Sequence, residues 1–150
     1  MEQQTKKTPV FVSRRKVLFG ECDPDGVVYT PRYSDYVIEA SHDFLSSIFD
    51  AKGSALPLFF EQGVFPPARA LSFEFLKPIS WDDEIELQVW VESIGRTSFT
   101  IAVEGLVNEG DTAFSSRLTQ VCVSSASKEP MEIPESLQHV LYGAVANSKE

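Results

Sequence analysis

The sequence has few residues of the types that build disulfides, metal centres and nucleophile–histidine pairs. It contains two cysteines and two histidines among 150 residues. Two cysteines do not indicate a disulfide framework, and without a Cys-x-x-Cys pair or paired histidines no metal site is predicted. A Gly-x-Ser-x-Gly elbow and a glycine-rich phosphate loop are also missing, which argues against serine-hydrolase and nucleotide-binding functions.

Basic charge and long apolar runs are scarce as well. Thirteen lysines and arginines stand against 22 aspartates and glutamates, which gives a formal net charge of −9. Nucleic acid is therefore excluded as the main partner, whereas one small anionic ligand held by a few local cations is not. No segment resembles a signal peptide or a membrane span, so we expect a cytoplasmic protein without a membrane partner.

The rest of the composition is that of an ordinary globular protein, with 43% hydrophobic and 23% charged residues. A chain of 150 residues is long enough for one domain. Such a domain buries about two-thirds of the surface of its unfolded chain. We therefore predict a single domain over residues 1–150, with loose tails at 1–8 and 143–150.

Hydrophobic periodicity predicts one long helix and several strands. Residues 31–51 place apolar side chains at the helical period over a wide arc, so this helix should be enclosed on most sides. Alternation predicts strands at residues 10–19, 68–76, 84–93, 97–107 and 112–124, a hairpin turn at 108–111 and a short helix at 134–142. One helix followed by antiparallel strands indicates an α+β fold in which the sheet wraps around the helix.

The most informative segment is GECDPDGVVYTPRY at residues 20–33. Its Pro-Asp-Gly step at 24–26 is typical of a tight turn, and Thr30 with Pro31 is typical of a helix start. A carboxylate close to a helix N-terminus lies beside unpaired amide donors, a pairing that can attack and polarise a carbonyl. A type I turn beginning at Asp23 explains the same residues without any chemistry.

This segment resembles the signature of the 4-hydroxybenzoyl-CoA thioesterase family. The likeness includes VLF before it and SDYV after it, and continues in PISWDDEI at 78–85 and GRTSF at 95–99. It covers roughly residues 17–134. The resemblance implies a hotdog fold, in which an antiparallel sheet wraps around one long central helix. It also implies hydrolysis of an aromatic (hydroxybenzoyl-CoA-like) or other small to medium acyl-CoA.

The resemblance further implies roles for individual residues. Asp23 takes the place of the family's catalytic carboxylate, which either attacks the thioester carbonyl or activates a water. The backbone amide of Thr30 is the implied donor to the carbonyl oxygen, with Tyr29 beside it. Tyr33 and Arg96 are implied to bind substrate. Coenzyme A is part of the substrate, so no separate cofactor is expected.

The chain departs from the family pattern at two places. Relatives of the hydroxybenzoyl type carry a basic cluster where this chain has Arg96 alone, and Arg96 is equally well explained as an exposed hairpin charge. The CoA phosphates would then be held by a neighbouring subunit or by Arg69, Lys77 or Arg117. Ile38 stands where many relatives have an acidic residue, which favours an acyl group without a ring hydroxyl.

Several residues around the signature segment are open to more than one interpretation. Cys22 is a poor nucleophile because acidic neighbours oppose thiolate formation, and Glu21 and Asp25 are expected to be turn-forming or solvated. Phenylalanines such as Phe73 and Phe75 belong either to the core or to an acyl pocket. Because one fold can host several functions, the alternative is a non-catalytic acyl-CoA or acyl-carrier binding module. A dehydratase is a weaker third hypothesis, since the loop offers no histidine.

The predicted fold also has consequences for assembly. A single sheet around one helix leaves both sheet edges exposed, and exposed edges favour pairing. The family resemblance implies that two sheets join edge to edge and that the active site lies between subunits. We therefore predict a homodimer or homotetramer.

Overall fold

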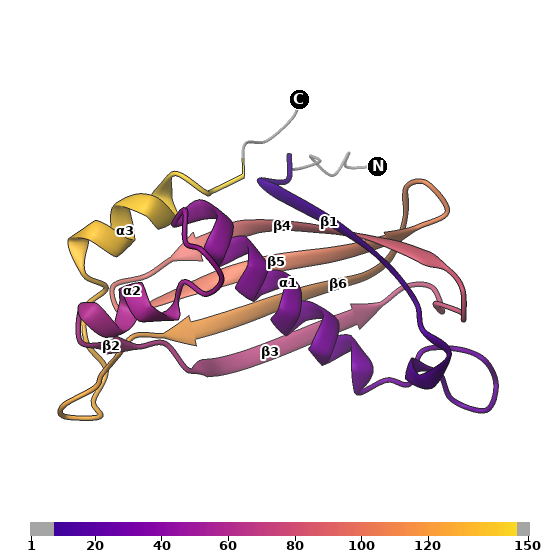
Figure 1. Ribbon diagram of the computed structural model, residues 1–150, viewed down its shortest axis with the longest axis horizontal. Helices are drawn as coiled ribbons and strands as arrows, with labels where there is room; N and C mark the ends of the chain where they lie inside the picture. The colour runs from indigo at the N-terminus through magenta and orange to yellow at the C-terminus, as the bar shows by residue number, and fades with distance from the viewer. Residues whose placement is uncertain (1–7, 147–150) are drawn as a thin grey trace, which may run out of the picture.

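The computed structural model describes residues 8–146, which form three α-helices, one 3-10 helix and seven strands. Figure 1 shows them in the order β1 (Phe11–Lys16), η1 (Phe19–Glu21), α1 (Arg32–Ile48), α2 (Leu56–Glu61), β2 (Val64–Phe65), β3 (Ala68–Phe75), β4 (Glu84–Ile94), β5 (Ser98–Val107), β6 (Asp111–Val121), β7 (Val123–Ser124) and α3 (Glu135–Tyr142).

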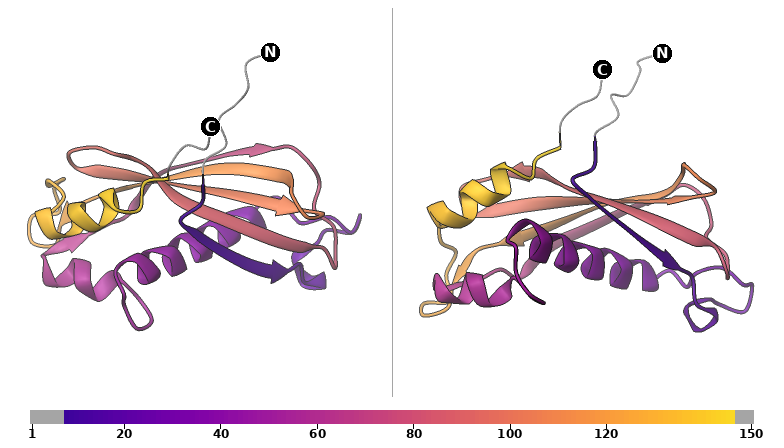
Figure 2. Two further views of the ribbon diagram at one scale, coloured as in Figure 1. Left: turned by 90° about the horizontal axis from the view of Figure 1, so that it is seen from above. Right: turned by 45° about the horizontal axis from the view of Figure 1, so that its top comes forward.

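The main element is an antiparallel sheet of five strands in the order β1-β4-β5-β6-β3. Helix α1 lies across one face of this sheet, as both views in Figure 2 show. Strand β4 alternates buried Ile85, Leu87 and Val89 with more exposed residues, so one face of the strand is apolar. The core lies between that face and α1, which is the α+β arrangement that the pattern predicts.

Helix α1 is covered on one side only. Its buried stripe contains Tyr36, Val37 and Phe44, each with no exposed surface. Ile38, in contrast, is 51% exposed and lies on the opposite side of the helix. The enclosure on most sides that the wide apolar arc predicts is therefore not found in the single chain.

The predicted strands and helices are present within a few residues of their expected bounds, but residues 56–65 differ. The sequence shows only broken apolar pieces there, whereas the chain forms α2 and the short strand β2, which pairs with β7. Pro57 lies in the first turn of α2. A proline is tolerated there because the missing N–H would have no partner in the helix.

The predicted C-terminal tail starts later than expected. The backbone N–H of Val91 donates to the carbonyl oxygen of Ala144 at 3.0 Å, and Val145 forms a parallel bridge with Val91. Residues 143–146 are thus attached to β4, which corrects the expectation that they are loose. The remaining predicted tail residues, 1–7 and 147–150, lie outside the described part, whereas Thr8 is described. Within residues 8–146, no helix has the length and apolarity needed to cross a membrane.

Candidate active site

The turn at residues 23–26 is closed by backbone hydrogen bonds. The N–H of Gly26 donates to the carbonyl oxygen of Asp23 at 2.9 Å, and the N–H of Asp23 donates to that of Val27 at 2.8 Å. Gly26 has a φ of 82°, a conformation that glycine accepts without strain. The predicted tight turn is therefore confirmed.

The Asp23 side chain is half-buried, and its two carboxylate oxygens differ in their contacts. Its Oδ1 accepts the N–H of Asp25 at 2.9 Å and that of Val27 at 3.4 Å, which is the arrangement of an Asx turn. Within residues 8–146, its Oδ2 has no hydrogen-bond or ion-pair partner. The same side chain therefore stabilises its turn and keeps one oxygen free for chemistry.

The connection between β3 and β4 anchors this turn. Val28 N–H donates to the carbonyl oxygen of Ile79 at 2.8 Å, and Trp81 N–H donates to that of Gly26 at 3.0 Å. Val27 and Ser80 form a β-bridge between the two segments. The downstream segment PISWDDEI thus forms the surface against which the turn lies.

Helix α1 begins at Arg32, and the side chain of Thr30 does not cap it. Pro31 already has helical backbone angles, φ −61° and ψ −21°, and no side-chain capping bond is present. The first amides instead donate to carbonyl oxygens of the preceding turn, Arg32 to Tyr29 at 2.8 Å and Tyr33 to Thr30 at 3.2 Å. This corrects the predicted N-cap role of Thr30 and places Pro31 one position earlier than expected.

The backbone N–H of Thr30 has no hydrogen-bond acceptor within the described residues. Its neighbour Tyr29 uses its own N–H, which donates to the carbonyl oxygen of Glu21 at 2.9 Å. An unpaired amide at the start of a helix is an available donor for a developing negative charge.

A mostly apolar hollow of about 330 Å³, the aromatic hollow, lies next to this amide. Its lining residues come from the turn, α1 and the end of β3: Val27, Val28, Thr30, Tyr33, Phe75, Leu76, Lys77 and Pro78. The Tyr33 ring is 5% exposed and meets the rings of Phe75 and Phe114 edge to face, with centroids at 4.9 and 5.3 Å. Burial raises the pKa of Tyr33, so its hydroxyl stays protonated.

Cys22 lies beside Asp23 and is not activated. Burial and the charges of Asp23, Glu21 and Asp83 raise the pKa of its thiol, in that order. This direction agrees with the prediction that acidic neighbours oppose thiolate formation, with burial as the larger cause. Glu21 itself is not solvated, because its side chain is 15% exposed and pairs with Arg15 at 2.5 Å. Sequence reasoning missed this contact, although Arg15 occupies the inward position of the alternating strand β1.

The family of the chain is shown by its similarity to known proteins. Residues 17–141 match the family described as the Thioesterase-like superfamily. The chain belongs to the thioesterase-like superfamily. A protein of Aquifex aeolicus, provisionally named an esterase, is 30% identical over 131 residues, or 87% of this chain and 97% of its own length.

A second relative and one solved structure are also similar to the chain. The 1,4-dihydroxy-2-naphthoyl-CoA hydrolase of Thermosynechococcus vestitus is 27% identical over 132 residues, 87% of each chain. The crystal structure of a thioesterase superfamily protein from Jannaschia sp. CCS1 superimposes with a TM-score of 0.83 at 23% identity, covering 97% of this chain and 99% of that one. The fold is the hotdog fold that the resemblance implies.

Within one chain, Arg96 does not lie near the Asp23 turn. It lies in the β4–β5 turn, pairs with Glu132 at 3.2 Å and has a side chain that is 77% exposed. Strand β4 begins next to the Asp23 turn and runs to Ile94, a span of roughly 30 Å, so Arg96 lies at the opposite end of the sheet (Figure 1). Tyr29, in contrast, is beside the turn and 56% exposed.

The other cations considered for the CoA phosphates are placed differently. Lys77 lines the aromatic hollow and pairs with Asp111 at 2.9 Å. Arg117 lies 5.9 Å from the Trp90 ring, on the sheet face away from α1. Arg69 is exposed and has no ion pair within the described residues.

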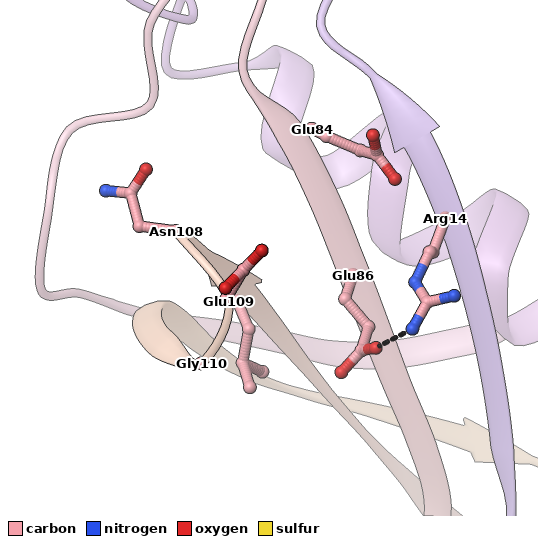
Figure 3. Close-up of a pocket in the computed structure, with 7 residues that line it drawn as sticks. Arg14, Glu84, Glu86, Asn108, Glu109 and Gly110 are labelled. Atoms are coloured by element: carbon pink, nitrogen blue, oxygen red, sulfur yellow. Dashed lines mark hydrogen bonds and ion pairs between the residues drawn. The ribbon is translucent and has the colours of Figure 1, made fainter.

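A larger hollow of about 650 Å³, drawn in Figure 3, includes neither Asp23 nor Thr30 in its lining. It is lined by Arg14, Glu84, Glu86, Leu106, Asn108, Glu109 and Gly110. Its single arginine is bound to Glu86 at 2.9 Å, and hydrogen bonds from Gln88 and Arg14 lower the pKa of that carboxyl. Three carboxylates repel an anionic ligand, so size does not make this hollow the better site. No metal-ligand cluster is found within residues 8–146.

Proposed function

We propose that the chain hydrolyses acyl-CoA thioesters, with Asp23 as the catalytic carboxylate and the Thr30 amide as the donor to the carbonyl oxygen. One observation carries the proposal: a free carboxylate oxygen and an unpaired amide belong to one short loop beside an apolar hollow. Membership of the thioesterase-like superfamily supports a hydrolase.

Two mechanisms fit a carboxylate in this position. Asp23 either attacks the thioester carbonyl and forms a mixed anhydride that water then cleaves, or it removes a proton from the attacking water. In both, negative charge develops on the carbonyl oxygen, and the N–H of Thr30 stabilises it. The products are the free acid and the CoA thiol.

The acyl group is proposed to be aromatic, as in the 4-hydroxybenzoyl-CoA thioesterase family. The edge-to-face rings of Tyr33 and Phe75 offer a surface for a planar ring, and Phe75 is 50% exposed. The Thermosynechococcus relative is named for an aromatic acyl-CoA. Ile38 does not line the aromatic hollow within one chain, so it can influence the acyl group only across an assembly.

A homodimer or homotetramer completes the proposal. One row of paired residues crosses the sheet from β3 to β4 and consists of Ala68, Gln120, Phe99 and Ile94. Arg69 and Arg96 lie next to this row, so both are at the end of the sheet that is far from Asp23. Antiparallel pairing of two β3 edges about a two-fold axis would bring that end of one subunit next to the Asp23 turn of the other. Arg69 or Arg96 of the neighbour would then hold the CoA phosphates.

A cytoplasmic location is part of the proposal. Both cysteines are free, as expected in a reducing compartment.

The alternative is an acyl-CoA or acyl-carrier binding module without turnover. Its motivation is that the Asx turn accounts for the position of Asp23 without chemistry. In that case Asp23 would serve the loop alone, and the aromatic hollow would hold the acyl group.

Thiol release from a panel of acyl-CoA thioesters separates the two. The panel is benzoyl-CoA, 4-hydroxybenzoyl-CoA, 1,4-dihydroxy-2-naphthoyl-CoA and hexanoyl-CoA. We expect hydrolysis, with kcat/KM for the best aromatic ester roughly tenfold or more above that for hexanoyl-CoA. Tight binding by isothermal titration with no thiol released over hours would favour the binding module.

A further inference from the structure

Three side chains from three segments meet behind the Asp23 turn. The Oε2 of Glu21 accepts a hydrogen bond from Nη2 of Arg15 at 2.5 Å. Its Oε1 accepts the backbone N–H of Leu18 at 2.9 Å and the hydroxyl of Tyr36 at 3.1 Å. Arg15 belongs to β1 and Tyr36 to α1, while Glu21 lies two residues before Asp23. Arg15, Glu21 and Tyr36 are called the Glu21 network below.

Arg15 strengthens the link to the helix. Its guanidinium lies 4.2 Å from the centre of the Tyr36 ring, and its Nη1 donates to Oε2 of Glu39 at 3.0 Å. Arginine suits this position because its planar fork can bond two carboxylates and stack on a ring at once. Strand β1 is therefore held to two successive turns of α1 and to the segment that precedes Asp23.

The hydroxyl of Tyr36 can act only as the donor to Glu21. Tyr36 has no exposed surface. Burial and the neighbouring Glu21 charge raise its pKa, so the phenol keeps its proton throughout the neutral range.

The Glu21 network connects the Asp23 turn to the helix start that carries the Thr30 amide. Besides its side-chain bond to α1, Glu21 accepts the N–H of Tyr29 at its backbone oxygen, one residue before Thr30. The Arg15–Glu21 ion pair is partly buried. Ion pairs contribute little net stability at the surface, and buried ones contribute little compared with apolar residues of similar size. Stability alone therefore gives a weak reason for placing these polar groups here.

We propose that Glu21 is a positioning residue. Through Arg15 and Tyr36, it fixes the position of the turn that carries Asp23 relative to the helix start that carries the Thr30 amide. This inference rests on the proposed function. It concerns the geometry of the reacting groups, because no residue of the Glu21 network lines the aromatic hollow.

The expected effect is on turnover. A displacement of reacting groups by 1 Å can lower the rate by about a hundredfold. Removing one of the hydrogen bonds to Glu21 should displace them less, so we expect Tyr36→Phe to lower kcat by roughly tenfold. KM should stay unchanged because the groups that contact the acyl chain are intact.

The experiment compares Tyr36→Phe and Glu21→Gln with the matched control Tyr142→Phe, well below the melting temperature of each variant. Tyr142 is 58% exposed on α3, so the control removes the same atom from a residue outside the site. We expect a lower kcat at constant KM in the first two and wild-type kinetics in the control.

Unchanged kcat in both Tyr36→Phe and Glu21→Gln, with only a lower melting temperature, would overturn the proposal and leave a structural role. If Glu21→Gln does not fold, Tyr36→Phe, which removes a single oxygen atom, decides alone.

Hydrogen exchange separates failure of this inference from failure of the proposed function. If the wild-type chain hydrolyses no thioester, the proposed function fails, but the hydrogen-bonded amides of Asp23, Gly26, Val28 and Tyr29 still report how firmly the turn is held. We then expect these amides to exchange about tenfold faster in Tyr36→Phe than in Tyr142→Phe, a change that follows loss of about 1.4 kcal/mol of local stability. Equal exchange in the two variants would overturn the positioning role.

Discussion

Burial and neighbouring charge decide which single residues can react near the Asp23 turn. Cys122 has no exposed surface, and burial raises the pKa of its thiol to about 11. The pKa of Cys22 is also raised, first by burial and then by acidic neighbours. Neither thiol is therefore an ionised nucleophile at neutral pH, whereas Asp23 has an oxygen without a partner in the described residues.

The stability of the fold should fall in alkali because of Cys122. Its folded-state pKa of about 11 lies above the ordinary value of 9.0, so the folded chain holds this proton more tightly than the unfolded chain. The contribution is complete below pH 9 and is lost as pH rises toward 11. At pH 10.5 the free energy of unfolding should be lower than at pH 8 by about 2 kcal/mol from this group.

Urea unfolding of the wild type and Cys122→Ala at both pH values, under reducing conditions, measures this loss. The buried tyrosines Tyr33 and Tyr36 act in the same direction in both proteins, so the variant serves as their control. An equal loss of stability in the two proteins would show that Cys122 is not responsible.

The site could be predicted from the sequence only in part. Turn-forming residues at 24–26 indicate the loop, but the resemblance to the thioesterase family, not the turn, singles out Asp23. The role of Glu21 could not be predicted, because its partners Arg15 and Tyr36 come from β1 and α1 and meet only in the folded chain. The sequence predicts Thr30 as the cap of α1, but Pro31 continues the helical backbone before Arg32.

Among the elements, the β5–β6 hairpin carries local strain. Asn108, Glu109 and Gly110 all have positive φ, at 49°, 59° and 137°. Asparagine and glycine tolerate this region, whereas a glutamate at positive φ costs about 1–2 kcal/mol. The composition of the segment predicts the turn, and Glu109 is its least suitable residue.

Glu109→Gly should therefore raise the free energy of unfolding by about 0.5–1 kcal/mol, after allowance for the greater freedom of glycine in the unfolded chain. Glu104→Gly, within β5, is the matched control and should lower it by about the same amount. Urea denaturation gives both values. Destabilisation by Glu109→Gly would mean that this side chain has a favourable role that outweighs its backbone strain.

Element type was predictable where the hydrophobic period was clear, as in β4, β5 and α1. It was not predictable at residues 56–65, where Pro57 and Gly63 interrupt the pattern and α2 depends on packing of Phe59 in the core. The pairing of Val145 with β4 has no local signal either, since Val91 lies far away in the sequence.

At the scale of the whole molecule, the two edges of the sheet differ. Strand β1 ends in Arg14, Arg15 and Lys16, charges of the kind that keep an edge from pairing. Strand β3 has eight residues, of which seven are exposed, and includes apolar Leu71 and Phe75. The β3 edge is therefore the expected place for a second copy.

Light scattering tests this assembly. We expect a mass of at least twice the 16.7 kDa of one chain. Leu71→Lys should favour the monomer, because lysine on an edge strand opposes pairing, whereas the matched change Val12→Lys on β1 should not. A stable and fully active 16.7 kDa monomer of the wild type would contradict both the assembly and a site shared between subunits.

The central claim is that the Asp23 carboxylate performs the chemistry, and Asp23→Asn tests it directly. Asparagine keeps the Oδ1 acceptor that the amides of Asp25 and Val27 use, so the turn should survive. The measurement is kcat for the best aromatic acyl-CoA of the panel, in wild type, Asp23→Asn and the control Asp25→Asn. We predict a loss of at least about a hundredfold in Asp23→Asn and near wild-type turnover in the control. Full turnover by Asp23→Asn would contradict the account.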